Sequence, residues 1–138
     1  MVTFVRMPGR QAASTTECMD GGPKQSFREL VVWQRAIETC LAVYTLTQKF
    51  PREEMYGLTN QMKRAGVSVA SNIAEGYGRL SRDQYRHFLG IAQASNYELQ
   101  TQLVIAREFT FGDPKQVTAT EATSCEVGKM LTAMLKRL

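Results

Sequence analysis

Few residues of this 138-residue chain have types that could do chemistry, and their spacing does not favour it. The single histidine, His87, has Gln84 three residues before it, where the di-iron carboxylate bundles place a glutamate. The pattern therefore predicts no metal and no cofactor. His87 also falls about 160° from the apolar stripe of its predicted helix, so a place on solvent or at an interface is favoured over a ligand role.

Cys40 and two glutamates are the remaining candidates for catalysis. Cys40 lies on an apolar stripe, and the sequence offers no base partner, so a small buried hydrophobe is favoured over a nucleophile. Glu75 and Glu98 could act as a general acid and base. A structural link from either carboxylate to Arg64, Arg79 or a helix end is the favoured alternative.

The segment EGYGR, residues 75–79, superficially resembles a phosphate-binding loop. It follows a predicted helix instead of a strand and lacks the Lys-Ser/Thr ending, so the match is rejected. With no catalytic pattern left, we expect a protein that is not an enzyme.

One polar pattern is not explained by composition. Polar side chains recur at helical spacing beside the apolar stripe of the predicted helix 52–76: Gln61, Arg64, Ser68, Asn72 and Glu75. Two interpretations stay open. The stripe is either a buried hydrogen-bond ladder that fixes helix register, or the polar lining of a subunit seam or channel.

Three arginines cluster at the turn that follows this helix: Arg79, Arg82 and Arg86. A solvated loop is one interpretation. The other is a site that holds phosphates, because guanidinium groups bind phosphate oxygens in bidentate geometry. Lys63, on the outer face of the predicted helix 52–76, is a further candidate for nucleic-acid binding.

Four helices are needed to position these residues. Ser26 and Glu29 have capping-box spacing, which predicts a first helix over residues 26–49. Its predicted apolar stripe is Trp33, Ile37, Cys40, Leu41 and Tyr44. Pro51 ends that helix and suits the first turn of the next, residues 52–76. Glycines at 76 and 78 predict that the second helix ends with residues that tolerate positive φ.

Ser81 is a predicted N-cap for a third helix over residues 82–109, and Asp113-Pro114 predicts the start of a fourth over 114–137. No strand alternation competes with these patterns. Short connections between long helices make sequential helices antiparallel neighbours. The fold class predicted is all-α, an antiparallel up-down-up-down four-helix bundle.

Composition indicates one domain with an ordinary globular balance, 43% hydrophobic and 22% charged residues. Residues 1–25 show no period and are interpreted as a flexible N-terminal extension, with the bundle domain at 26–138. No apolar run is long enough to span a bilayer, so we expect no membrane partner. Three widely spaced cysteines favour a reducing cytoplasm. The net charge of +4 is spread thinly, and only an oligomer would gather it on one face.

Two windows without any charged residue, AGVSVASNIA at 65–74 and FLGIAQASNY at 88–97, point to an oligomer. A helix without a charged face must be covered on more than one side, which a chain this short cannot do alone. Small residues on the back of the predicted helix 52–76 would permit close approach: Val67, Ala70, Ser71 and Ala74. Ala70→Glu is then expected to dissociate or unfold the assembly.

Three segments carry a resemblance to a known family: FRELVVWQRA at 27–36, FPREEMYGLTNQMKRAGVSVASNIAEGYGR at 50–79 and YRHFLGIAQASNYELQTQL at 85–103. They resemble bacterial four-helix-bundle proteins encoded in intervening sequences of large-subunit ribosomal RNA genes. The accessory variability determinant of diversity-generating retroelements is part of the same group. The resemblance covers about residues 27–138 and is most specific over 50–103.

The resemblance implies a left-handed bundle assembled as a homopentamer, with no active site. For the retroelement protein it implies binding of a reverse transcriptase and of RNA through basic surface. We therefore expect a non-enzymatic, homo-oligomeric accessory protein that binds RNA or DNA. The alternative is a protein-interaction scaffold without nucleic acid, with a reverse transcriptase or another protein as partner.

Overall fold

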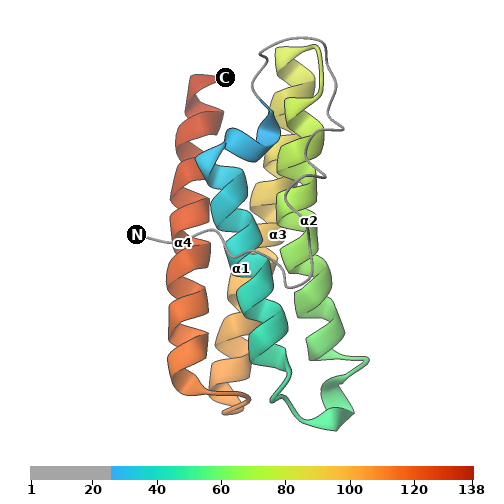
Figure 1. Ribbon diagram of the computed structural model, residues 1–138, viewed down its shortest axis with the longest axis vertical. Helices are drawn as coiled ribbons and strands as arrows, with labels where there is room; N and C mark the ends of the chain where they lie inside the picture. The colour runs from blue at the N-terminus through green and yellow to red at the C-terminus, as the bar shows by residue number, and fades with distance from the viewer. Residues whose placement is uncertain (1–25) are drawn as a thin grey trace, which may run out of the picture.

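The computed structural model describes residues 26–138, which form four long helices packed side by side (Figure 1). The helices are α1 (Val31–Thr47), α2 (Leu58–Tyr77), α3 (Arg82–Glu108) and α4 (Pro114–Arg137), with short 3-10 turns η2 (Phe27–Glu29) and η3 (Arg52–Glu54). Within 26–138 there is no strand. The predicted all-α, up-down-up-down bundle is confirmed. The predicted extension, residues 1–25, lies outside the described residues.

Two predicted helix starts are confirmed by their caps. The Ser81 hydroxyl accepts a hydrogen bond from the Gln84 backbone N–H and begins α3. The Asp113 carboxylate accepts one from the Lys115 backbone N–H, and Pro114 occupies the first turn of α4. Both caps satisfy backbone donors that have no partner inside the helix.

Two other predicted helix starts are wrong. Ser26 accepts from the Arg28 backbone N–H and caps only the turn η2, so α1 begins five residues later, at Val31. Pro51 precedes the turn η3, and α2 begins at Leu58. The end of α2 needs no positive φ, because Gly78 has a φ of −79°. At both positions the predicted start begins only a single 3-10 turn, and the chain then bends before the long helix begins.

The core consists of two stacked apolar clusters that run along the bundle axis. One surrounds Val69, Ile73 and Leu89, and the other surrounds Met62, Leu99 and Leu103. All six of these residues belong to α2 or α3. Burial of such large side chains is the main stabilising contribution to a bundle of this size.

The stripe predicted for the first helix is out of phase with the core. The side of α1 that faces the other helices carries Val32, Ala36, Thr39, Val43 and Leu46. Tyr44, by contrast, is 41% exposed. Trp33 and Ile37 are partly buried and pack against the first cluster, whereas the small residues Ala36 and Thr39 lie inside the bundle, where they let α1 approach its neighbours. Thr39 is tolerated because its hydroxyl donates to the Arg35 carbonyl oxygen.

Candidate nucleic-acid interface

The polar stripe of α2 is not a buried ladder. Gln61, Arg64 and Glu75 are exposed, and only Ser68 and Asn72 are half-buried. The Ser68 hydroxyl lies 2.7 Å from that of Ser95 on α3, and the Asn72 amide donates to the Ser68 carbonyl oxygen. The lower half of the stripe borders a polar groove of about 470 Å³ between α2 and α3. The other interpretation, a polar lining for a subunit seam or channel, stays a prediction.

A buried polar ladder does exist, but it joins α3 to α4. The Asn96 amide donates to the Ser124 carbonyl oxygen at 2.9 Å, and the Ser124 hydroxyl donates back to Asn96 at 2.8 Å. One turn away, the Gln93 amide donates to the Gly128 carbonyl oxygen and to Thr132. The sequence signal was Asn96, a polar residue within an apolar stripe. This ladder fixes the register of α3 against α4.

Two of the three predicted arginines have structural partners. Arg79 pairs with Glu75 at 2.9 Å, and its guanidinium lies 4.6 Å from the centre of the Phe88 ring. Arg86 donates to the Leu135 and Leu138 carbonyl oxygens at 2.6 and 2.9 Å, across from α3 to the last turn of α4. Carbonyls at a helix end favour such a cation. The ion pair confirms the structural role expected for Glu75.

The Arg86 contact brings the last turn of α4 to the turn between α2 and α3 (Figure 1). Two exposed residues that sequence reasoning missed, Lys136 and Arg137, therefore join the cluster. They lie about fifty residues from Arg86 in the chain, and only the antiparallel topology makes them neighbours. The basic end is defined here by five residues: Arg79, Arg82, Arg86, Lys136 and Arg137.

Charge differs between the two ends of the bundle. Among the described residues near the basic end, three are acidic, Glu29, Glu75 and Asp83, and Arg28 adds a further positive charge. The opposite end has four basic residues and five acidic ones: Lys49, Arg52, Arg107, Lys115, Glu53, Glu54, Glu108, Asp113 and Glu121. There Arg107 also pairs with Glu121. The fold thus collects a modest net charge at one end, which the linear sequence did not show.

Lys63 is not part of the basic end. It lies in the second turn of α2, sixteen residues before Arg79, which is about 24 Å along a helix. Its ammonium group lies 4.9 Å from the centre of the Tyr44 ring on α1. Of the predicted nucleic-acid residues, the structure brings the three arginines together and separates Lys63 from them.

The other chemically competent residues have surroundings that do not suit catalysis. Cys40 is half-buried against Gly66, and burial raises the pKa of its thiol, which disfavours the reactive thiolate. His87 is exposed and packs edge-on against Phe88. Within residues 26–138 no three His, Cys, Asp or Glu residues come together in a way that could hold a metal ion.

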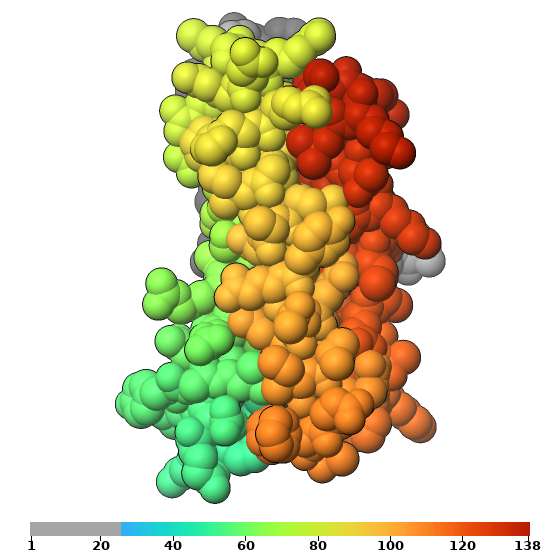
Figure 2. All heavy atoms as spheres, turned by 180° about the vertical axis from the view of Figure 1, so that it is seen from behind, coloured from blue at the N-terminus to red at the C-terminus, as the bar shows by residue number. Residues whose placement is uncertain are grey.

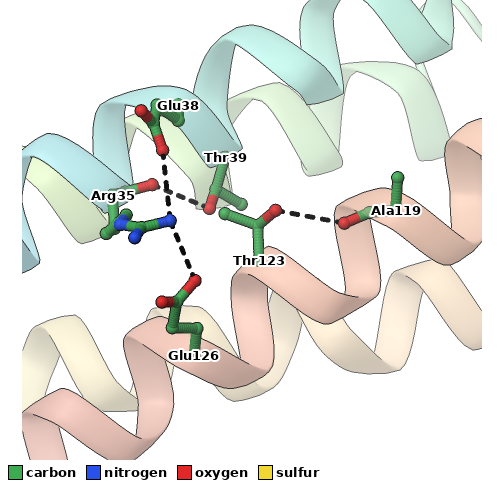
Figure 3. A network of polar contacts seen from close by, with 6 residues as sticks. All are labelled: Arg35, Glu38, Thr39, Ala119, Thr123 and Glu126. Atoms are coloured by element: carbon green, nitrogen blue, oxygen red, sulfur yellow. Dashed lines mark hydrogen bonds and ion pairs between the residues drawn. The ribbon is translucent and has the colours of Figure 1, made fainter. Parts of the chain in front are cut away.

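A charged network, missed by sequence reasoning, joins α1 to α4 on another side of the bundle (Figure 3). The Arg35 guanidinium points between two carboxylates, 3.1 Å from Glu126 and 3.8 Å from Glu38. The Glu38 carboxyl is buried, and this burial raises its pKa, although Arg35 acts in the opposite direction. With one guanidinium between two carboxylates, the network adds no positive charge to a binding surface.

The charge-free windows leave apolar residues on the outside of α2 and α3. Val67 is 43% exposed and Ile91 36%, and a Cβ at Gly90 would have no neighbour within 4 Å. Ile105 is 39% exposed further along α3, the helix that runs the length of the face in Figure 2. Val67 lies beside Tyr44 and Lys63, on the side of α2 toward α1. Ala70 is wrongly placed by the prediction. It is 5% exposed within the core of the single chain, so Ala70→Glu would not test assembly.

The model of the family described as "23S rRNA-intervening sequence protein" matches residues 28–133, most of the chain. The chain belongs to this family. Comparison with curated proteins gives no match.

Among solved structures, the chain resembles a protein of unknown function from the S23 ribosomal protein family of Bacteroides thetaiotaomicron. The TM-score is 0.69 at 22% identity, over 77% of this chain and 99% of the other. This likeness supports the bundle fold of the family member described here. In the part of the chain that the structure describes, no helix is long and apolar enough to cross a membrane.

Proposed function

We propose that this family member is a non-enzymatic, self-assembling bundle that binds RNA or DNA through its basic end. The observation that carries the proposal is the segregation of charge, with basic residues gathered at one end and a mixed population at the other. The family description, which names an intervening sequence of 23S rRNA, is compatible with an RNA partner.

Within the basic end, the residues have different parts. Arg79 and Arg86 are held by Glu75 and by the end of α4, so they fix the shape of the surface. Arg82, Lys136 and Arg137 are exposed and form no ion pair with a residue of 26–138. We therefore assign the phosphate contacts to them. Phosphate contacts release counterions and supply most of the affinity for a nucleic acid.

A fluorescence anisotropy titration with labelled RNA at about 50 mM salt tests the proposal, because weak electrostatic complexes survive at that ionic strength. The variant Arg82→Gln/Lys136→Gln/Arg137→Gln should bind far more weakly than the wild type. Its control, Lys49→Gln/Arg52→Gln/Lys115→Gln, removes the same charge from the opposite end and should bind like the wild type. Equal affinities of the two triple variants would contradict the proposed site.

Self-assembly is proposed through exposed apolar side chains of α2 and α3: Val67, Ile91 and Ile105. A ring of copies repeats the basic end and multiplies its charge, which one copy alone does not supply. The family resemblance implies a pentamer, whose mass would be about five times 15.5 kDa. Sedimentation at micromolar concentration measures this, and a monomer would contradict it.

Ile91→Glu tests the surface itself. Ile91 is partly exposed in the single chain, so a glutamate there can reach water in the monomer but would be unpaired inside an assembly. We expect this variant to lower the mass while keeping its helical circular dichroism. Ala122→Glu, on the exposed side of α4, is the control that should keep the wild-type mass.

The second candidate function is a protein-interaction scaffold without nucleic acid, for example one that binds a reverse transcriptase. The observation that favours it is the same exposed apolar surface, which would suit a different partner chain. Absence of RNA binding at about 50 mM salt, together with an oligomeric mass, would favour this candidate.

A further inference from the structure

A second groove, distinct from the one beside the polar stripe, runs between α3 and α4 and has a volume of about 480 Å³. Its lining includes Tyr97 and Gln100 from α3, and Cys125, Gly128, Lys129 and Lys136 from α4. In Figure 2 the two helices lie side by side along this groove, α3 in yellow to orange and α4 in red.

Tyr97 presents an aromatic surface at this groove. Its side chain is 54% exposed, and within residues 26–138 no aromatic ring or cation packs against its ring. Tyr44, in the groove between α1 and α2, differs because the Lys63 ammonium already lies over its ring. Tyr97 therefore offers the face of its ring to a planar ligand.

The charged side chains that line this groove are both positive. Lys129 and Lys136 line the groove, and no acidic residue is among its lining. Seven residues of helix separate the two lysines by about 10.5 Å, so they lie at different points along the groove. Lys136 belongs also to the basic end, so the groove continues the proposed phosphate-binding surface along the bundle.

The back of the groove is rigid. Gly128 and Thr132 accept hydrogen bonds from the buried Gln93 amide, and Gln100 donates to the Ser124 carbonyl oxygen. A Cβ at Gly128 would lie 3.2 Å from the Asn96 amide nitrogen, so the glycine keeps α3 and α4 close. A fixed groove lowers the ordering cost of binding an extended ligand.

We propose that this groove binds a single strand of RNA or DNA, with a base stacked on Tyr97 and phosphates on Lys129 and Lys136. The inference rests on the proposed function and names its ligand as single-stranded. A duplex keeps its bases paired and stacked, so it cannot offer one to an aromatic side chain. Stacking also tolerates any base, which fits a surface that has few groups to recognise sequence.

The proposed assembly leaves the groove open. The α2–α3 surface lies on the side of α3 that carries Ile91 and Ser95, and Ser95 contacts Ser68 of α2. Tyr97 lies on the α4 side of the same helix, beside Cys125 and Lys129. A copy bound through Val67 and Ile91 therefore does not need Tyr97.

The first test compares a labelled RNA strand of about twelve nucleotides with its duplex. The wild type should prefer the single strand, and Tyr97→Ala should weaken single-strand binding about 5- to 100-fold, as expected for one lost stacking contact. Tyr97→Phe should bind like the wild type, and Lys129→Gln should weaken binding of both forms. Tyr44→Ala removes the tyrosine of the groove between α1 and α2; it is the control and should not change RNA binding.

The second test measures alkylation of Cys125, the exposed thiol within the groove, in a Cys18→Ser background. The strand should slow its reaction with iodoacetamide, whereas half-buried Cys40 should react slowly with or without RNA. If the wild type binds no RNA, the proposed function itself fails. If it binds RNA while Tyr97→Ala binds equally and Cys125 stays reactive, only the groove inference is overturned. If a higher protein concentration slows the alkylation of Cys125 without RNA, a second copy of the chain covers the groove. That result would also overturn the groove inference.

Discussion

Replacing two glycines by alanine probes the contact that holds the basic end together. Gly76 lies in the last turn of α2, where it meets the first turns of α3, and Gly90 lies in the middle of α3 on its exposed side. An alanine at Gly76 would place its Cβ 2.8 Å from the Phe88 Cβ and 3.3 Å from the Tyr85 carbonyl oxygen. At Gly90 it would meet nothing within 4 Å.

The magnitude follows from these distances. Each exchange gains up to about 1 kcal/mol of helix propensity. At Gly76 the atoms in the way belong to the backbone or lie next to it, so α2 and α3 must move apart, at a cost of about 1–3 kcal/mol. We therefore expect Gly90→Ala to be more stable than the wild type, and Gly76→Ala to be about 1–3 kcal/mol less stable than Gly90→Ala.

Urea unfolding followed by circular dichroism measures this difference. The protein concentration must be the same for all variants, because self-assembly makes apparent stability depend on it. The stability of Gly90→Ala relative to the wild type gives the gain from helix propensity alone. If Gly76→Ala proves as stable as Gly90→Ala, the close contact of α2 with α3 is refuted. The positions of Arg79 and Arg86 would then also be in doubt.

Three further changes are expected to separate core from surface roles. Asn96→Ala should lose about 2 kcal/mol or more, because it leaves the buried Ser124 groups unpaired; Thr101→Ala, at an exposed site, should lose little. Glu38 has a raised pKa, so its stabilising contribution is lost as pH rises through that value. The urea midpoint of Glu38→Gln, relative to that of the wild type, should therefore be higher at about pH 7 than at about pH 4. Ala70→Glu should unfold the single chain, seen as lost helical circular dichroism at every protein concentration.

Much of the fold could be predicted from local signals. Ser81 and Asp113 are caps that act within one helical turn, and the apolar periods of α2 and α3 directly mark the faces that are buried. The phase of α1 could not be predicted, because that helix is apolar on two sides. Only the packing of its neighbours selects the small residues Ala36 and Thr39 for the core.

The candidate site was predictable only in part. Arg79, Arg82 and Arg86 are close in sequence, so their cluster was visible as a pattern. Lys136 and Arg137 join them through the antiparallel topology, which places the end of α4 beside the start of α3. The separate location of Lys63 is likewise a matter of distance along α2, which its outer-face position did not reveal.

The salt dependence of RNA binding tests the central claim most directly. The logarithm of the wild-type binding constant should fall steeply and linearly with the logarithm of salt concentration, because bound counterions are released. The slope should become shallower in Arg82→Gln/Lys136→Gln/Arg137→Gln and stay unchanged in Lys49→Gln/Arg52→Gln/Lys115→Gln. A wild-type slope near zero, or the same slope in both triple variants, would contradict a nucleic-acid interface at the basic end.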